Sequence, residues 1–177
     1  MEIKIVKLKR QFYLDNSDKK ELLDHDNPQK GTRRKYLLRI DIGTSSILIP
    51  FRSNVVPGRD RDVKKGFISP VSGKASAGLS FEKLIIMKND SDYILSITNL
   101  DREVPETQVR KITRNIEKIT NSVKNYLTAY KKLYEERPEA VSHHFLFRYS
   151  TLQYFHKELG LEKEKVIKKE NDKGLIP

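Results

Sequence analysis

A short run of reactive and phosphate-binding side chains, Arg52-Ser53-Asn54, follows an apolar, β-rich stretch of the chain. A serine hydroxyl can donate to or accept from a phosphate oxygen, and arginine binds phosphate in a forked geometry that lysine cannot match. The run opens the segment 54–80, which is rich in glycine, proline and serine. A segment this long between strands is usually functional or mobile. By spacing alone, however, such a run is more often an ordinary turn at a strand end.

The composition excludes several other kinds of chemistry. There is no cysteine, which rules out disulfides, thiolate zinc sites and cysteine nucleophiles. No nucleotide-binding loop, dinucleotide fingerprint or paired-histidine metal motif occurs. His143 and His144 are adjacent, so on a helix their side chains point apart, and the aspartates form no tight cluster of the kind that holds magnesium. We therefore expect neither a metal nor another cofactor.

RNA can be cut without a metal, because its own 2′-hydroxyl can attack the adjacent phosphate and leave a 2′,3′-cyclic phosphate. A protein need only align the nucleophile, offset the charge on the phosphorane oxygens and assist proton transfer. Arginine, lysine, serine and tyrosine suffice for this, although a base near neutral pH then requires a perturbed lysine or a relay.

The charge of the chain favours a polyanionic partner. The formal net charge is +11 and the isoelectric point is near 9.7. Lysines and arginines that displace condensed counterions supply sequence-independent affinity for nucleic acids. The alternative is a merely solvated basic surface, and residues 161–177 do mix both signs of charge like a mobile tail.

Hydrophobic periodicity predicts an α+β chain whose first half is rich in strands. Gly43–Ser45 predicts a hairpin connection, and Pro50 indicates a bulge or an edge position because proline cannot donate to a ladder. Residues 54–80 are expected to be irregular, and a turn is expected at Asn89–Asp92. The predicted strands are an opening strand around Ile3–Lys7, then Tyr36–Ile42, Ser46–Arg52, Phe81–Lys88 and Tyr93–Thr98.

From Pro105 the apolar period changes to three and four residues, which predicts one long helix that Pro138 ends. Its apolar stripe comprises Val109, Ile112, Ile116, Ile119, Val123, Tyr126, Tyr130 and Leu133. For its basic face, ordinary solvation is the alternative to polyanion binding; that face holds Lys111, Arg114, Lys118, Lys124, Lys131 and Lys132. A further helix is predicted over 150–160, capped by Ser150 and ended by Gly160.

We expect a single domain, 1–177, with strands mainly in 1–100, a helical part at 105–160 and a mobile tail at 161–177. The N-terminus has no uninterrupted apolar run, and no later segment reaches the length of a membrane span. These features predict a cytoplasmic protein with no membrane partner.

Several segments together resemble the toxins of type III toxin–antitoxin systems, the ToxN/AbiQ superfamily and especially its TenpN-like branch. They are Ile-Pro-Phe-Arg-Ser at 49–53, Lys65-Gly66-Phe67, Gly-Leu-Ser-Phe-Glu-Lys at 78–83 with the apolar run after it, and the helix at 108–130. The resemblance spans roughly residues 1 to 135. The sequence departs from the family at Ser80, where aspartate is usual, and at 54–56, where histidines often follow the serine.

The resemblance implies a compact SH3-like antiparallel β-barrel related to the MazF and Kid toxins, with one long and several short helices. It implies a metal-independent, sequence-selective endoribonuclease that cleaves cellular mRNA. Its partner would be an antitoxin RNA, a pseudoknotted repeat RNA that the toxin cuts from a precursor and that then inhibits it in a cyclic or other higher assembly.

Carried onto this sequence, the resemblance implies that Ser53 is the active-site serine and Arg52 its phosphate-binding neighbour. Tyr36 would line the site, and Lys83 matches the lysine after the Gly-Leu pair. The expected RNA-binding residues are Arg33, Arg34, Lys35, Asn54, Arg59, Arg61, Lys64 and Lys65.

Alternatives remain open for the residues and for the function. Ser53 could be a structural hydroxyl that ends a strand, Tyr36 a half-buried barrel residue with its hydroxyl at the rim, and Lys83 a surface lysine before a buried strand. The function could be that of a non-catalytic nucleic-acid-binding barrel, or of a MazF-like ribonuclease inhibited by a protein antitoxin.

Overall fold

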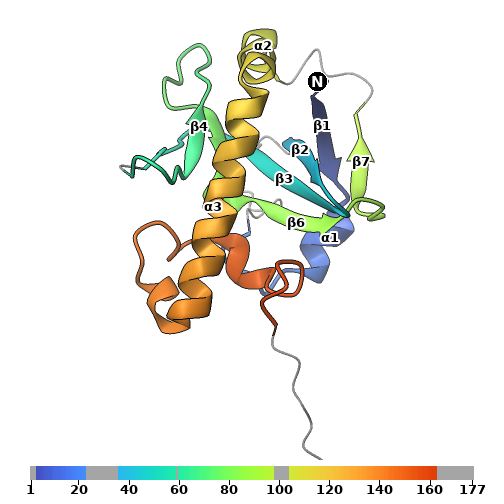
Figure 1. Cartoon of the computed structure of the whole chain (residues 1–177). Helices are drawn as coiled ribbons and strands as arrows, with labels where there is room; N and C mark the ends of the chain where they lie inside the picture. Colours follow the sequence, from blue (N-terminus) through green and yellow to red (C-terminus); the bar gives the residue numbers. More distant parts are fainter. Residues whose placement is uncertain (1–2, 23–35, 59, 98–103, 163–177) are drawn as a thin grey trace, which may run out of the picture.

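The protein combines an antiparallel sheet with one long helix that lies across it (Figure 1). The computed structural model describes residues 3–22, 36–58, 60–97 and 104–162. The strands are β1 (Lys4–Leu8), β2 (Leu37–Ile42), β3 (Ser45–Arg52), β4 (Gly66–Ile68), β5 (Gly78–Ser80), β6 (Ile85–Lys88) and β7 (Ile94–Ser96). The helices are α1 (Arg10–Asp15), α2 (Glu106–Arg114) and α3 (Ile116–Glu136), with 3-10 helices η2 (Phe81–Lys83), η3 (Pro138–Ser142) and η4 (Thr151–Tyr154). The predicted α+β class is confirmed.

Strands β2 and β3 form the hairpin that the sequence predicts. Ile42 pairs with Ser45 across a two-residue turn, in which Gly43 has φ +59°. A left-handed φ favours glycine because it has no Cβ to clash with the backbone. Pairing continues from this turn to Leu37 and Pro50, so the register of the whole hairpin is set.

Strand β3 pairs with three other strands. One edge pairs with β2, and the other is divided between β6, opposite Ser45–Leu48, and β5, opposite Phe51 and Arg52. Pro50 falls in the gap between these two partners, where a missing backbone N–H costs no hydrogen bond on that edge. The edge position predicted for this proline is therefore correct locally, although β3 is the central strand.

The described strands do not close into the predicted barrel. The path through the sheet is β4-β5-β3-β2-β1-β7, with β6 off this path beside β3. The strands at the two ends of the path, β4 and β7, are three residues long and each pairs with a single neighbour. Among the described strands β4 and β7 do not pair with each other, so the sheet stays open.

The segment 54–80 is more regular than the sequence predicts, because Gly66–Ile68 and Gly78–Ser80 pair as β4 and β5. The strand expected over 81–88 begins only at Ile85, since Phe81–Lys83 forms η2. The glycines at these two strand starts permit the pairing. A Cβ on Gly78 would lie 2.0 Å from the carbonyl oxygen of Phe67.

The long helix predicted from Pro105 is two helices, α2 and α3, separated at Asn115. The Asn115 side-chain amide donates to the Lys111 carbonyl at 2.8 Å, so it competes with the backbone for a helical acceptor. The apolar stripe continues across the break: Ile112, Ile119, Val123, Tyr126 and Tyr130 are all fully buried. Helix α3 ends at Glu136, just before Pro138, as predicted.

The predicted helix over 150–160 is wrong, since only the four residues of η4 are helical there. The predicted cap at Ser150 is present, since Ser150 Oγ accepts from the Leu152 amide at 3.3 Å; Gly160 has φ +70°, but no helix ends there. The buried Thr151 hydroxyl bonds to the carbonyls of Glu82 and Leu84, so contacts with η2 shape this segment. The tail predicted over 161–177 lies outside the described residues beyond Glu162.

We predict that Gly78→Ala displaces β4 and lowers the free energy of unfolding by about 3 kcal/mol, because its Cβ overlaps a backbone oxygen that cannot move freely. Gly73→Ala is the control: its Cβ meets nothing, and the cost is about 1 kcal/mol from its positive φ alone. Urea unfolding of both variants checks the difference. Equal losses would contradict the close β4–β5 approach.

Candidate active site at the end of β3

Ser53 lies directly after the last residue of β3 and is exposed, as is Asn54. The chain bends there, and the Ser53 carbonyl accepts from the Ser76 hydroxyl at 3.5 Å. Arg52 is partly exposed and pairs with Gly78 of β5. Arg52 and Ser53 are thus consecutive residues at the point where a well-paired strand ends.

Tyr36 lies at the same end of the β2–β3 hairpin. Its carbonyl accepts from the Phe51 amide at 3.1 Å, which places Tyr36 opposite the residue two positions before Ser53. The residue is only 3 % exposed, and the Lys7 ammonium lies 4.5 Å from the centre of its ring. Tyr36 therefore supports the strand ends from within the core.

Lys83 has a different environment from the one expected of a phosphate-binding lysine. Its ammonium forms an ion pair with the Glu21 carboxylate and donates to the Tyr149 carbonyl at 2.8 Å. Its side chain is 12 % exposed. The lysine therefore joins η2 to two segments that are distant in sequence.

Lys65 is held in the same way. Its ammonium lies 2.5 Å from the Glu82 carboxylate and donates to the Phe145 carbonyl at 3.3 Å, and its side chain is 14 % exposed. Lys65 and Lys83 thus fasten the start of β4 and η2 to the chain around residues 145–149.

The other predicted RNA-binding residues fall into two groups. Arg61 is exposed, and the Lys64 ammonium donates to the Asp60 carbonyl within the same loop. The remaining ones lie outside the described residues: Arg33, Arg34, Lys35 and Arg59.

The loop after Ser53 is organised around Asp60. The backbone amides of Val63 and Asp62 donate to this carboxylate, each at 2.8 Å, and they lower its pKa. The charges of Lys64 and His144 lower the pKa of Asp60 further. His144, which follows α3 and η3 in the chain, is therefore near enough to this loop to act on Asp60, which no local sequence signal indicates.

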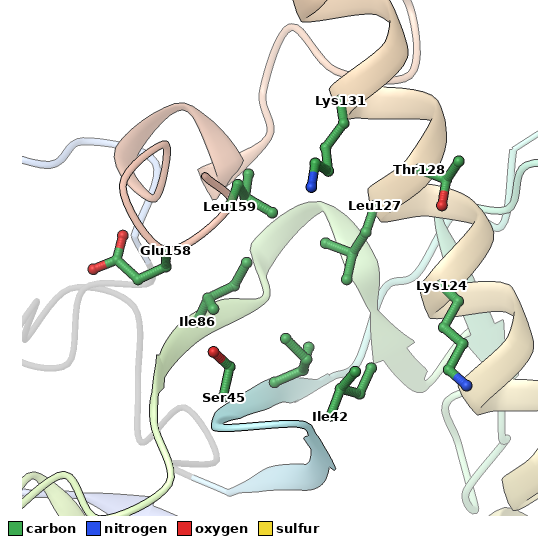
Figure 2. Close-up of a pocket in the computed structure, with 10 residues that line it drawn as sticks. Ile42, Ser45, Ile86, Lys124, Leu127, Thr128, Lys131, Glu158 and Leu159 are labelled. Atoms are coloured by element: carbon green, nitrogen blue, oxygen red, sulfur yellow. The ribbon is translucent and has the colours of Figure 1, made fainter. Parts of the chain in front are cut away.

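The described residues also form a groove of about 390 Å³ between α3 and the sheet (Figure 2). Leu127 and Lys131 point toward it from the helix, and Ile42, Ser45 and Ile86 line it from the strands. The groove lies at the first residues of β3, about 23 Å along the strand from Arg52 at the usual rise per residue. None of the predicted catalytic residues lines it.

His156, whose pKa is lowered, contacts two tyrosines of α3. Its Nε2 is 2.8 Å from the Tyr130 hydroxyl, and its ring packs 4.2 Å from that of Tyr134. Burial lowers the pKa of His156 and raises that of Tyr130, so both groups remain uncharged at neutral pH. This pair joins the residues that follow η4 to α3.

No protein-family model, curated protein or solved structure matches this chain. Within the part of the chain that the structure describes, no three histidine, aspartate or glutamate side chains gather as metal ligands do. Among the same residues, no helix has both the length and the apolar character needed to cross a membrane.

We predict that Lys83→Met lowers the free energy of unfolding by about 1–2 kcal/mol, because the Glu21 carboxylate loses its partner and the Tyr149 carbonyl its donor. Urea unfolding measures the loss, and Lys88→Met, at an exposed lysine of β6, is the matched control. In the Glu21→Gln background the loss should shrink. Unchanged stability in Lys83→Met would contradict the structural assignment.

Stability should also fall on acidification through His156. Its folded pKa lies below the unfolded value of 6.5, so the unfolded chain binds the proton more readily. The contribution of His156 to the free energy of unfolding is fully present above pH 6.5. It is lost as the pH falls through the lower folded pKa. Thermal unfolding of His156→Gln, with His143→Gln as the exposed control, should isolate it. An identical pH dependence in His156→Gln and the wild type would refute the assignment.

Proposed function

We propose that the protein is a metal-independent, sequence-selective endoribonuclease of toxin type, which cleaves cellular mRNA and its own repeat-RNA antitoxin precursor. The observation that carries the proposal is the exposed Ser53 beside Arg52, where β3 leaves the sheet. The resemblance of the surrounding sequence to the ToxN/AbiQ toxins and the net charge of +11 support it.

In this mechanism the 2′-oxygen of the RNA attacks its own phosphorus, and the bond to the 5′-oxygen of the next nucleotide breaks. Arg52 binds the non-bridging oxygens and offsets their growing charge. Ser53 hydrogen-bonds to the reacting phosphate or relays the proton from the 2′-hydroxyl toward the departing 5′-oxygen, so the products are a 2′,3′-cyclic phosphate and a free 5′-hydroxyl. Tyr36, packed beneath the strand ends, keeps these two residues in place.

Lys83 takes a positioning role in this proposal. Its ammonium is held by Glu21 and by the Tyr149 carbonyl, so the proposal gives Lys83 no contact with the phosphate. Arg61 and Asn54, both exposed in or beside the loop after Ser53, are the described residues best placed to contact the RNA backbone.

The proposal includes kinship of the sheet with the SH3-like fold of the MazF and Kid toxins. Its support is the long strand β3, which pairs with β2 along one edge and on the other edge with β6 at its start and with β5 at its end. In small orthogonal β-structures, long strands pass from one sheet to the other at such a corner.

The proposed inhibitor is the processed antitoxin RNA, held in a cyclic or other higher assembly with the toxin. The neighbouring genes test this part separately. A tandem-repeat noncoding tract upstream supports an RNA antitoxin, whereas a small acidic reading frame supports a protein antitoxin.

We predict that Ser53→Ala abolishes RNA cleavage and growth arrest but leaves RNA affinity largely unchanged, because the hydroxyl acts on the reacting phosphate and the basic residues remain. The measurement is incubation of purified protein with cellular RNA in EDTA, followed by mapping of the product ends. The wild type should produce discrete cuts that end in 2′,3′-cyclic phosphates.

Ser142→Ala, at an exposed serine of η3, is the matched control and should cut like the wild type. Cleavage that persists in Ser53→Ala at equal expression would disprove the site. Intact RNA with the wild type, together with binding that weakens steeply in salt, would leave a non-catalytic binding protein.

A further inference from the structure

Two aromatic side chains are exposed on the turn at residues 145–149, which lies between η3 and η4. Phe145 is 52 % exposed and Tyr149 is 51 % exposed, whereas Leu146 and Phe147 between them are each 3 % exposed. The buried pair packs inward: the Phe147 ring lies 5.2 Å from that of Tyr126 on α3. The turn therefore anchors itself with its middle residues and presents an aromatic ring at each end.

Each exposed ring has a polar partner beside it. The Arg148 guanidinium lies 4.8 Å from the centre of the Tyr149 ring. The His144 ring is stacked on Phe145 at 4.9 Å between centroids, with 29° between the planes. About half of each aromatic side chain still faces solvent, so each retains surface for a further flat partner.

The backbone of both residues is fixed by the two ion-paired lysines. Lys65 donates to the carbonyl of Phe145, and Lys83 donates to the carbonyl of Tyr149. The Tyr126 hydroxyl donates to the carbonyl of Leu146 at 3.2 Å, from the opposite side of the turn. Held at both ends and in the middle, the turn keeps the two rings in a defined arrangement.

We propose that Phe145 and Tyr149 form a stacking platform for unpaired bases of bound RNA. The inference rests on the proposed function, because it assigns to this turn the recognition of the RNA that Ser53 would cleave. Aromatic rings in single-strand-binding proteins accept bases on their faces, and a neighbouring arginine strengthens the contact with the electron-rich base.

The arrangement suits RNA better than a protein partner. The exposed apolar surface of the turn consists of two separate rings, since the residues between them are buried or charged. A protein-binding surface usually presents a contiguous apolar patch. Bases spaced along a phosphate chain match separate rings beside cationic groups.

The turn is linked to the candidate active site through the loop that follows Ser53. The backbone amide of Val55 donates to the Ser76 carbonyl at 2.8 Å, and the backbone amide of Lys65 donates to the Pro57 carbonyl at 2.7 Å. The Lys65 ammonium then reaches Phe145. A single-stranded RNA bound at Ser53 and extending along this loop would reach Phe145 and Tyr149.

The test measures RNA binding in the Ser53→Ala background, where binding is separated from cleavage. The probe is a labelled, unstructured RNA of about 12 nucleotides, within the usual site sizes of single-strand-binding folds. Phe145→Ala and Tyr149→Ala should each weaken its binding about tenfold, which is typical for the loss of one base–aromatic stack. The salt dependence should not change, because no phosphate contact is removed.

Three controls make the outcome specific. Leu14→Ala and Leu95→Ala remove exposed apolar side chains on α1 and β7, and should leave affinity unchanged. Phe145→Tyr and Tyr149→Phe retain the rings and should bind like the parent protein. An RNA of equal length with abasic positions should bind the parent and the alanine variants equally.

Affinity unchanged in the Phe145→Ala, Tyr149→Ala double variant would overturn the platform. Equal weakening toward the abasic RNA would also overturn it, because the lost contact would then not be to a base. Failure of the proposed function looks different: the wild type would leave RNA uncut in EDTA or would not bind the probe at all.

Discussion

The pairing of β3 on both edges is the constraint on which the rest of the structure depends. Because β6 and β5 occupy successive parts of one edge, the chain between them must turn aside, and η2 forms at that point. Pro50 lies at the same gap and cannot recruit a further strand there. The end of β3 is consequently held by β2 and β5 while the next residue, Ser53, leaves the sheet. A reactive side chain directly after a rigid strand is well positioned, since little conformational freedom remains to be lost on binding.

A second feature of the structure is the contact between η2 and the turn at 145–149, which follows α3 in the chain. Lys65 and Lys83 are oriented by Glu82 and Glu21, and both donate to carbonyls of the turn at 145–149. Tyr126 and Phe147 pack against each other from the helix side. The carboxylates offset the free-energy cost of removing the two ammonium groups from water. The lysines in turn donate to carbonyls that no helix or strand pairs. The family resemblance attributes a site role to Lys83, and the structure shows its ammonium paired with Glu21 and bonded to the Tyr149 carbonyl.

The sequence anticipated the elements whose patterns are local. The hairpin at Gly43, the strand end at Arg52, the apolar stripe from Ile112 to Tyr130 and the cap at Ser150 follow from periodicity, turn chemistry and capping. It failed where distant partners compete with local preference. Thr151 bonds to η2 in place of a helix interior, and Gly66 and Gly78 pair two strands of three residues that carry almost no periodic signal. The barrel expectation failed for a related reason, because closure depends on how short edge strands meet.

For the candidate site the division is similar. Sequence alone determined the residue types and their order: a serine after an arginine at a strand end, a basic chain without cysteine, and a buried helical stripe. Those properties depend on composition and on neighbours within a few positions. Only the tertiary structure decided that Tyr36 is buried beneath the strand end, that Lys83 is paired with Glu21, and that Phe145 and Tyr149 face solvent from a turn held by two lysines. The lysine contacts join residues that are separated by 60 or more positions. The exposure of a side chain depends on which other residues cover it. The order of residues along the chain encodes neither.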